Sequence, residues 1–388
     1  MKVLLINSVC GIGSTGRICT DIADELIKQG HECKIAYGRG VVPEKYSNIV
    51  VRIGSKYNNI VDALKTRLFD NAGFNSKRAT KKFIKWLKLY NPDVIHLHNL
   101  HGYYINIEIL FKYLTTCGKK IVWTLHDEWA FTGHCAVLGS CEKWQEGCLN
   151  CTKNKAYPSS FVNKSKKNFL KKKGLFMGLE EMTLVTPSKW LANLAKQSFL
   201  KKYDIQVINN GIDTSVFKPT QSDFREKYGL QDKKLVLGVA SIWGKGKGFD
   251  DFVRLSKILD NSYKIVLVGV SQKQIKELSK EILAIRRTNN VKELAKIYTI
   301  ADVFVNATYI DNYPTVNLEA QCCGTPVITY STGGSVESVP EEYVVEQGNV
   351  EKLAEKIVEV CKDKKAKVLH LDSFDKKTMI KDYIKMFS

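Results

Sequence analysis

The feature that most constrains the fold is an alternation of short apolar runs with amphipathic segments, which begins almost at the first residue. Apolar runs lie at residues 3–7, 33–37, 94–97, 121–125 and 184–186. Segments with helical periodicity, such as residues 18–28, separate them. Parallel strands need a crossover between them, usually a helix, and this order of elements is the pattern of a β-α-β fold. We therefore predict an α/β fold with a doubly wound parallel sheet in the first half of the chain.

The same alternation starts again past the middle of the chain. Apolar runs lie at residues 235–240, 264–268, 303–306 and 326–329. Helical patterns lie between and around them, at residues 249–259, 272–278, 291–297 and 315–322. A chain of 388 residues also exceeds the length at which a single core stops growing. The repetition predicts a second Rossmann-like domain.

The boundary between the two predicted domains falls near residues 207–219, where Asn-Gly and a proline mark a loop. We assign residues 1–205 to an N-terminal domain and residues 206–375 to a C-terminal domain. A last amphipathic pattern, residues 376–388, is expected to pack back on the N-terminal domain.

The charge of the chain is positive and unevenly distributed. The net charge is +19, and residues 1–190 hold 29 Lys and Arg against 15 Asp and Glu, a net of +14, which leaves +5 for the rest. A basic half attracts nucleic acid, nucleotide sugars or anionic lipid headgroups. No apolar run is long enough for a membrane-spanning helix, which needs roughly 18 residues or more. The apolar part of the N-terminus is also too short for a signal peptide, so we expect a cytoplasmic protein whose eleven cysteines stay reduced.

A glycine-rich loop follows the first predicted strand. Gly11, Gly13 and Gly16 form the G-x-G-x-x-G pattern that brings a phosphate to a helix N-terminus. An NAD-binding domain would place an acidic residue at the end of the second strand, but that strand runs into Tyr37 and Arg39. The chain also has no Tyr-x-x-x-Lys for hydride chemistry. The loop is interpreted as facing a phosphate-bearing ligand, with a tight turn without ligand as the alternative.

Two carboxylates, Asp311 and Glu319, lie on either side of a predicted helix start in DNYPTVNLE. The first N–H groups of that helix would face an anion. Glu319 lies about one turn into the helix, where its carboxylate could accept bonds from two ribose hydroxyls, and Asp311 could hold a sugar hydroxyl. We expect further contacts to the same ligand along this segment from Asn312, Tyr313, Thr315 and Val316. A solvent-facing Asp and a helix-stabilising Glu are the alternative.

This segment, with the AQCCGTPVI that follows it, resembles the retaining glycosyltransferases of family 4, which have the GT-B fold of two Rossmann-like domains facing a cleft. Their hallmark is Glu-x7-Glu, so Asp311 and Glu319 occupy the two acidic positions, the first with a shorter side chain. The resemblance covers nearly the whole chain and includes three further segments: VTPSKWLANLAKQSFL, NNGIDTSVFKP and GVASIWGKGKGFDDF.

The resemblance implies roles for three further residues. Lys247 matches the lysine that grips the donor phosphates, and Lys245 would substitute for a nearby arginine of the family, although a lysine cannot make the bidentate grip of an arginine. His126, just past the strand at residues 121–125, matches a histidine that faces the donor sugar. A purely structural role for His126 and a surface position for Lys245 are the alternatives, and His96 and His98 are weaker candidates of the same kind.

Four cysteines lie close together in the sequence after His126: Cys135, Cys141, Cys148 and Cys151. The closing C-x2-C is typical of a tetrahedral zinc site, and four thiolates would make that site structural. Free buried thiols, or disulfides in an oxidising compartment, are the alternatives.

Two lysine-rich stretches, residues 76–90 and 164–173, combine basic side chains with aromatic or apolar ones. Such a pattern can lie on an anionic membrane, and a core-packing helix with a basic outer face is the alternative. We expect the N-terminal domain to dock on the inner face of the cell membrane.

The sequence thus predicts a hexosyltransferase that moves a sugar from a UDP- or GDP-sugar to an acceptor hydroxyl, and the resemblance implies retention and no catalytic metal. The resemblance implies a role in bacterial surface polysaccharide synthesis (capsule, exopolysaccharide or O-antigen) on a glycan acceptor that is lipid-linked. The rivals are an NAD(P)-dependent epimerase or reductase and a zinc-containing nucleic-acid-binding protein. A nucleic-acid-binding role does not account for the acidic segment from Asp311 to Glu319, so no nucleic-acid partner is expected.

Overall fold

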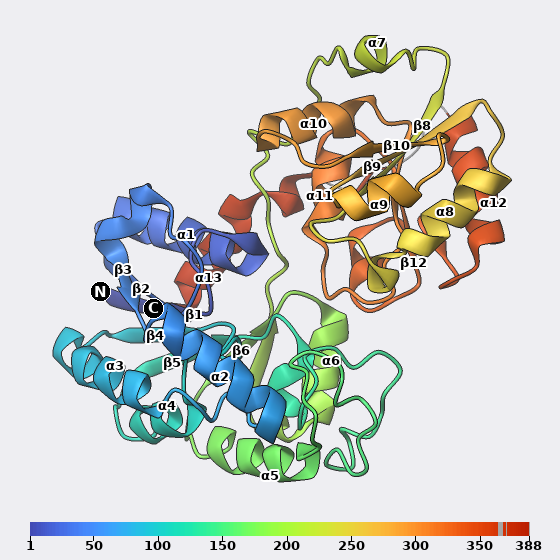
Figure 1. The fold of residues 1–388 in the computed structure, drawn as a ribbon. Coiled ribbons are helices and arrows are strands. Elements are labelled where there is room, and N and C mark those ends of the chain that lie inside the picture. Colours follow the sequence, from blue (N-terminus) through green and yellow to red (C-terminus); the bar gives the residue numbers. More distant parts are fainter. Residues whose placement is uncertain (364–367, 370, 388) are drawn as a thin grey trace. The chain divides into compact units, whose positions relative to one another are not determined.

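The computed structural model describes residues 1–363, 368–369 and 371–387. The chain forms two compact units, one of Met1–Ile208 with Ile380–Ser388 and one of Asn209–Met379. Each unit is built on one parallel sheet with helices on both faces (Figure 1). The prediction of two Rossmann-like α/β domains is confirmed.

The first unit has a seven-stranded sheet in the order β3-β2-β1-β4-β5-β6-β7. The strands are β1 (Lys2–Asn7), β2 (Glu32–Tyr37), β3 (Val50–Arg52), β4 (Val94–Leu97), β5 (Lys120–Thr124), β6 (Thr183–Thr186) and β7 (Asp204–Val207). Strands β1, β4 and β5 are buried along almost their whole length, as expected for parallel strands between two helical layers. The winding reverses between β1 and β4, and ligands bind past the carboxyl ends of the strands at such a reversal.

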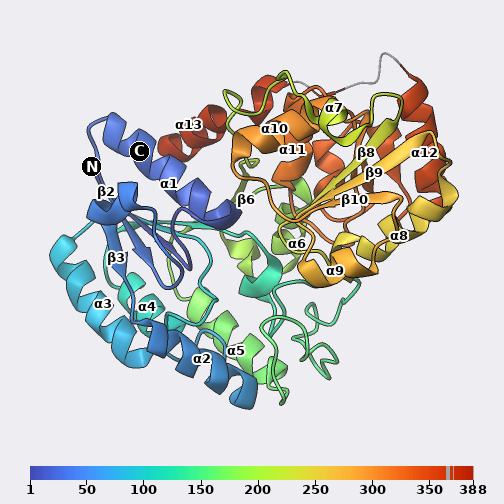
Figure 2. The same ribbon diagram turned by 45° about the horizontal axis from the view of Figure 1, so that its top comes forward.

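Helices cover both faces of this sheet. They are α1 (Gly13–Lys28), α2 (Lys56–Phe69), α3 (Lys77–Tyr90), α4 (Ile107–Leu114), α5 (Ser165–Phe176), α6 (Lys189–Gln197) and α13 (Lys376–Phe387). Figure 2 shows α1 and α13 on one face and α3, α4 and α5 on the other. Successive side chains of β4 point to opposite faces of the sheet. The His96 ring lies 5.1 Å from that of Tyr383 on α13, whereas Ile95 and Leu97 belong to the core beneath α3.

The second unit has a six-stranded parallel sheet in the order β10-β9-β8-β11-β12-β13. The strands are β8 (Lys234–Val239), β9 (Tyr263–Val268), β10 (Ile282–Ile285), β11 (Val303–Asn306), β12 (Val327–Tyr330) and β13 (Val344–Val345). The helices are α7 (Phe224–Tyr228), α8 (Phe249–Ile258), α9 (Gln272–Glu277), α10 (Val291–Ile300), α11 (Thr315–Cys322) and α12 (Val350–Lys362). The winding reverses between β8 and β11, so the loops after these two strands are where a ligand is expected.

The lysine-rich helix predicted at residues 76–90 packs its aromatic face into the protein. In α3, Phe83 and Leu87 belong to the core, and the ring of Trp86 stacks on those of Phe83 and Tyr90 at 5.8 and 5.0 Å between centroids. The core-packing alternative therefore describes this helix, and its aromatic side chains are used within the unit.

Within the part of the chain that the structure describes, no helix combines the length and apolarity needed to cross a membrane.

Candidate active site

An ion pair joins the loops that follow β8 and β11, the two strands at which the second sheet reverses. Lys247 ends the short turn Lys245–Lys247, and its Nζ lies 2.6 Å from Asp311 Oδ2. The same Nζ donates to Thr308 Oγ1 at 3.4 Å. The Tyr309 N–H donates to the Gly246 carbonyl at 3.0 Å, so the two loops are also joined through their backbones. Both charged groups are partly exposed, and a ligand can therefore reach them.

Glycines allow the close approach of these loops. Gly248 has φ +70°, and a Cβ there would clash with the Ala307 carbonyl oxygen, so a side chain would push the Lys247 turn away from the loop after β11. A Cβ on Gly333, in the loop after β12, would clash with the carbonyl oxygen of Asp311, which accepts from the Gly334 N–H at 3.0 Å. Three loops thus fix the backbone of Asp311.

The helix α11 starts four residues after Asp311. It follows Pro314, whose side chain has no acceptor for the first N–H groups of the helix, those of Thr315 and Val316. The carbonyl of Tyr313 accepts from Asn210 Nδ2 at 3.0 Å, and burial raises the pKa of the Tyr313 phenol to about 12. Together with Asn312, these residues place a helix N-terminus, with its partial positive charge, beside the loop of Asp311.

Glu319 is buried in α11, with 7% of its surface exposed. The Tyr298 hydroxyl on α10 donates to Glu319 Oε2 at 3.0 Å. Burial and the neighbouring carboxylate keep the pKa of Tyr298 well above its usual value, so the phenol keeps the proton that it donates. Sequence reasoning did not find Tyr298, because nothing in its segment distinguishes it from a core tyrosine.

A buried polar network that the sequence analysis also missed holds α11 in place. Asn306, the last residue of β11, donates from Nδ2 to Asn317 Oδ1 at 2.8 Å. Asn317 Nδ2 donates in turn to the hydroxyls of Ser338, at 2.9 Å, and Ser335, at 3.3 Å. Each buried amide therefore has partners, and the network fixes Asn317, within the Asp311–Glu319 segment, to β11 and to the segment of Ser335 and Ser338.

In the first unit, the glycine-rich loop leads from β1 into α1. Gly13 starts the helix with φ +65° and has open space where a Cβ would be, whereas Gly16 is buried against the Gly11 backbone. The Gly11 N–H donates to the Gly16 carbonyl at 3.0 Å. A Cβ at Gly16 would lie only 3.1 Å from the Gly11 nitrogen, so Gly16 serves the packing of the loop, whereas Gly13 borders open space at the helix N-terminus.

His126, predicted to be catalytic, follows β5 and belongs to a chain of histidines. Its Nε2 lies 3.0 Å from His98 Nδ1, and His96 Nε2 lies 2.8 Å from Thr124 Oγ1. Burial lowers the pKa of His126 to about 4 and that of His96 to about 3, and it lowers the pKa of His98 well below its usual value. All three rings are therefore neutral at pH 7, and His126 acts as a hydrogen-bonding group without a charge.

Comparison with protein families decides what kind of protein carries these groups. Residues 15–216, slightly more than half of the chain, match the family described as Glycosyltransferase Family 4. Residues 220–375 match the family described as Glycosyl transferases group 1. The chain belongs to glycosyltransferase family 4.

Similar proteins agree with the family. The glycosyltransferase is 25% identical over 346 residues to WcaC of Escherichia coli K12, whose name provisionally describes a colanic acid biosynthesis glycosyl transferase. The match covers 84% of this chain and 82% of that protein. Among solved structures, sucrose-phosphate synthase from Thermosynechococcus elongatus is similar, with a TM-score of 0.75, 16% identity and coverage of 100% and 98% of the two chains. Anabaena HepE, solved with UDP-glucose, has a TM-score of 0.67 and 15% identity over 99% and 98%. These structures show that the glycosyltransferase has the GT-B fold.

Near His126, the glycosyltransferase contains a second histidine arrangement that sequence reasoning missed. His101 Nε2 lies 2.6 Å from Asp127 Oδ2, and its Nδ1 lies 3.3 Å from the Tyr157 hydroxyl. Burial opposes ionisation of Asp127, but His101 and the Trp129 N–H together lower the pKa of that carboxyl below its usual value. The spacing of these residues in the sequence gives no sign of the contact, since Tyr157 is 56 residues from His101.

The zinc prediction for Cys135, Cys141, Cys148 and Cys151 is not supported and is corrected. Across residues 1–363, 368–369 and 371–387, no three or more His, Cys, Asp or Glu side chains are grouped so that they could hold a metal ion. Cys148 Sγ accepts instead from the Gly133 N–H at 3.1 Å, and Cys151 Sγ accepts from the Lys153 N–H at 3.4 Å. Burial raises the pKa of Cys135 to about 12, so its thiol keeps its proton.

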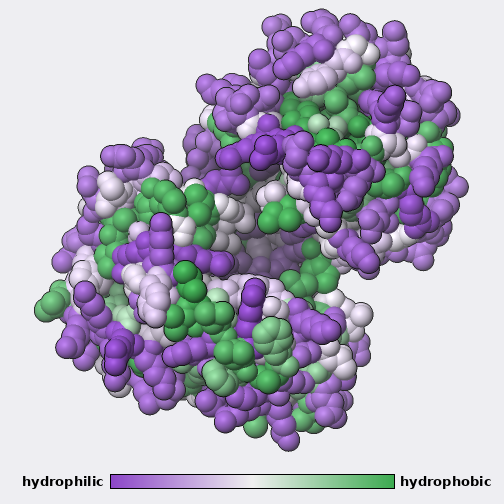
Figure 3. Space-filling view, viewed as in Figure 1, coloured by the Kyte–Doolittle hydropathy of each residue, from purple (hydrophilic) through white to green (hydrophobic). Residues whose placement is uncertain are grey.

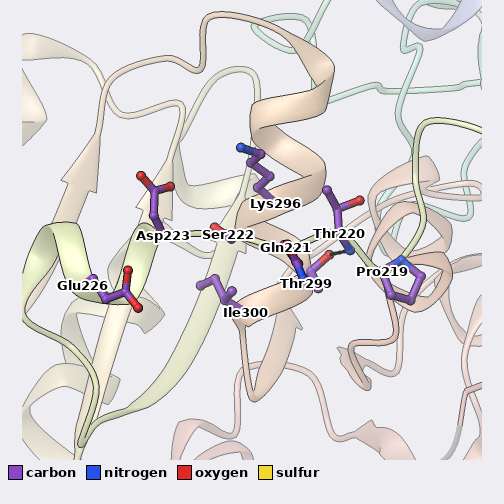
Figure 4. A pocket seen from close by; sticks show the side chains of 9 residues that line it. All are labelled: Pro219, Thr220, Gln221, Ser222, Asp223, Glu226, Lys296, Thr299 and Ile300. Atoms are coloured by element: carbon purple, nitrogen blue, oxygen red, sulfur yellow. Dashed lines mark hydrogen bonds between the residues drawn. The ribbon is translucent and has the colours of Figure 1, made fainter.

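A surface hollow of about 810 Å³ in the second unit lies away from these groups (Figure 4). Its lining comes from the segment before and within α7 and from α10: Pro219, Thr220, Gln221, Ser222, Asp223, Glu226, Lys296, Thr299 and Ile300. The helix α10 leads into the amino end of β11, so this hollow lies at the amino ends of the strands. Lys247 and Asp311 lie in loops at the opposite, carboxyl ends. It contains none of the predicted site residues.

Proposed function

We propose that this glycosyltransferase transfers a hexosyl unit from a UDP- or GDP-sugar to an acceptor hydroxyl with retention of the anomeric configuration. The observation that carries the proposal is the Lys247–Asp311 pair at the sheet reversal. Within that pair, Asp311 lies four residues before the first residue of α11. A cation and a helix N-terminus at this edge suit a diphosphate. The UDP-glucose complex of HepE, a neighbour with the same fold, supports a nucleotide-sugar donor.

The donor is assigned to the residues of the second unit. Lys247 and the first N–H groups of α11 neutralise the diphosphate, and Lys245, exposed in the same turn, adds charge to it. Glu319 accepts the ribose hydroxyls, which is compatible with its bond to Tyr298 because a carboxylate has about four acceptor positions. Asn312 and Tyr313, in the loop between β11 and α11, line the donor site. Asp311 accepts from a hydroxyl of the sugar.

The reaction needs charge stabilisation more than a strong base. The bond between the anomeric carbon and the diphosphate oxygen breaks while the acceptor oxygen bonds to that carbon from the same face. The departing diphosphate receives the acceptor proton, and Lys247 stabilises the charge that develops on it. Neutral His126 donates a hydrogen bond to the transferred sugar. Gly13 and Gly16, at the start of α1, leave backbone N–H groups for an anionic part of a substrate.

The acceptor is assigned to lipid-linked glycans of bacterial surface polysaccharide synthesis, at the cytoplasmic face of the membrane. The name of WcaC supports this assignment, since it describes colanic acid biosynthesis. The net charge of +14 over residues 1–190 supports it too, because a basic surface attracts anionic headgroups.

The test combines a donor screen with the stereochemistry of the product. A thermal-shift screen should show one UDP- or GDP-sugar raising the melting temperature, because that ligand binds only the folded state. Proton NMR of the product should show the same anomeric configuration as the donor. An inverted product would contradict retention, and a chain that responds to NAD and to none of the nucleotide sugars would contradict the donor assignment.

A further inference from the structure

The helix α2 (Lys56–Phe69) has its apolar side facing solvent. Tyr57, Ile60, Leu64 and Leu68 are 74%, 59%, 54% and 52% exposed, and the last residue, Phe69, is 50% exposed. The first four recur every three or four residues, so they lie on one face of the helix. A surface helix of a water-soluble domain normally turns such a face toward the core.

The opposite face of α2 is polar and buried. Its two buried residues are Asp62 and Thr66. Asp62 accepts from Asn75 Nδ2 at 3.0 Å and from the Ser76 hydroxyl at 2.5 Å. A buried carboxylate is costly unless it keeps such partners, and these bonds therefore fix the rotation of the helix about its axis. The apolar face is held outward by the structure and is not free to turn inward.

The exposed apolar surface continues beyond α2. Phe161 is 77% exposed. It is held at the end of α2, because the Phe161 N–H donates to the Arg67 carbonyl at 2.7 Å. Figure 3 shows hydrophobic side chains gathered over α2 on this face of the first unit. We call Tyr57, Ile60, Leu64, Leu68, Phe69 and Phe161 the α2 patch. Contiguous apolar surface of this kind marks an interaction site.

The edges of the α2 patch are basic. Lys56, Lys65 and Arg67 are exposed on the same helix, and the Lys164 Nζ lies 5.6 Å from the centre of the Phe69 ring. The one acidic residue in the helix is Asp62, which is buried. Apolar side chains flanked by lysine and arginine match a surface that is apolar below and negatively charged above, as an anionic bilayer is.

We propose that the α2 patch inserts its apolar side chains into the headgroup region of an anionic lipid bilayer. The inference rests on the proposed membrane-linked acceptor and names the surface that docks. The docking helix is then α2 and not α3, whose aromatic side chains are in the core or pack against it. The Asn59 side chain of α2 donates to the Tyr103 carbonyl at 2.8 Å, so the docked helix is tied to the loop that follows β4, at the carboxyl edge of the first sheet.

The test is sedimentation of the full chain with vesicles of phosphatidylglycerol and phosphatidylcholine, compared with vesicles of phosphatidylcholine alone. The wild type should sediment with the anionic vesicles and be partly released by salt. Leu64→Ser with Leu68→Ser keeps every charge and removes two apolar side chains, and it should lower the partition coefficient about tenfold or more. A matched control, Leu89→Ser with Ile258→Ser, changes two exposed apolar residues elsewhere and should partition as the wild type does.

Charge is tested separately. Lys56→Gln, Lys65→Gln and Arg67→Gln should reduce binding to anionic vesicles more than Lys81→Gln, Lys85→Gln and Lys88→Gln on α3. Equal partition of the Leu64/Leu68 variant and the wild type would overturn the proposal, as would a wild type that binds neither vesicle. A wild-type dimer that the Leu64/Leu68 variant dissociates would assign the patch to a second copy of the chain instead.

Nucleotide-sugar binding in the same variants, measured by thermal shift, separates this inference from the proposed reaction. All patch variants should retain it, because the patch contains none of the residues assigned to the donor. Loss of vesicle binding with donor binding intact supports the docking surface. A wild type that binds vesicles and no nucleotide sugar would contradict the reaction and leave the docking result standing.

Discussion

Lys247 Nζ and Asp311 Oδ2 lie 2.6 Å apart although 64 residues separate them in the chain. Each comes from a loop at the carboxyl edge of the second sheet, and the backbone bond between Tyr309 and Gly246 holds the two loops together. A diphosphate that binds Lys247 must share this ammonium with the carboxylate or displace it. In the proposed donor site, nucleotide binding and the position of Asp311 are therefore expected to depend on each other.

Asp311→Asn should bind free UDP more tightly and transfer sugar more slowly. The substitution removes a negative charge next to the diphosphate and leaves Lys247 free to bind it. Since the pair is partly exposed, the gain should be about 1 kcal/mol, or roughly fivefold in Kd. Calorimetric titration with UDP measures the first effect and initial rates measure the second. UDP affinity equal to that of the wild type would show that Asp311 does not compete for the lysine.

Lys247→Met should reduce kcat while the protein stays folded. Loss of one preorganised group that stabilises developing charge typically costs about 100- to 1,000-fold in rate, and Met retains the apolar stem of the side chain. Lys257→Met, on the exposed end of α8, is the matched control and should keep full activity. If kcat is unchanged in Lys247→Met, the lysine does not act on the leaving group.

Glu319→Gln should weaken nucleotide binding, because an amide accepts hydrogen bonds from ribose hydroxyls less strongly than a carboxylate. Hydrogen bonds to charged groups are worth roughly 1.5–3 kcal/mol, which corresponds to a 10- to 150-fold increase in Kd. Tyr298→Phe should have a smaller effect, of roughly two- to tenfold, because the tyrosine acts only by holding Glu319. Tyr228→Phe, at the surface of the same unit, provides the comparison. A larger loss from Tyr298→Phe than from Glu319→Gln would contradict these assignments.

Acid should destabilise the fold through the histidines next to β4 and β5. The pKa values of His96, His98 and His126 are lowered by burial from a usual 6.5, to about 3 for His96 and about 4 for His126. The unfolded chain therefore takes up protons first as the pH falls. The stability that these groups confer is present above their unfolded pKa and is lost as the pH falls toward their folded pKa values.

Each of these histidines should account for about 2 kcal/mol of the stability lost between pH 7 and pH 5. Urea unfolding at the two pH values measures the loss. His96→Asn does not titrate, so the loss in that variant should be smaller by about 2 kcal/mol. Identical losses in the variant and the wild type would show that His96 is protonated in the folded state.

The strands that the sequence analysis did not find are β3, β7, β10 and β13, and these are the four strands at the edges of the two sheets. Interior strands are apolar on both faces and read as continuous apolar runs. An edge strand is less buried, as the half-exposed β3 and the largely exposed β7 show. Strands β3 and β13 have only three and two residues, and β7 has two polar residues among its four, so each carries too short an apolar run for periodicity to detect it. The sequence ILAI of β10 is apolar throughout, and the sequence analysis missed it although the run is present.

The helix α1 was predicted from residue 18 and begins at Gly13. Its first turn reads GSTG, which has no apolar period, and it is helical because the chain enters it from β1 through the glycine loop. The same local reasoning predicted a zinc site from cysteine spacing. The structure pairs two of those sulfur atoms with backbone N–H groups, and spacing alone does not specify such bonds.

The sequence by itself determined the two parallel sheets and the edge at which Lys247 and Asp311 meet. Parallel strands must all deliver their following loops to the same edge, so a run of apolar strands already places those loops together. Only the tertiary structure decided which faces of α2 and α3 point inward. Both helices are amphipathic, and a periodic pattern shows that two faces differ without showing which one finds a partner. Phe83 reaches the core of the sheet, whereas Asp62 is bound by Asn75 and Ser76, which lie outside its own helix. The apolar face of α2 is therefore left to the solvent.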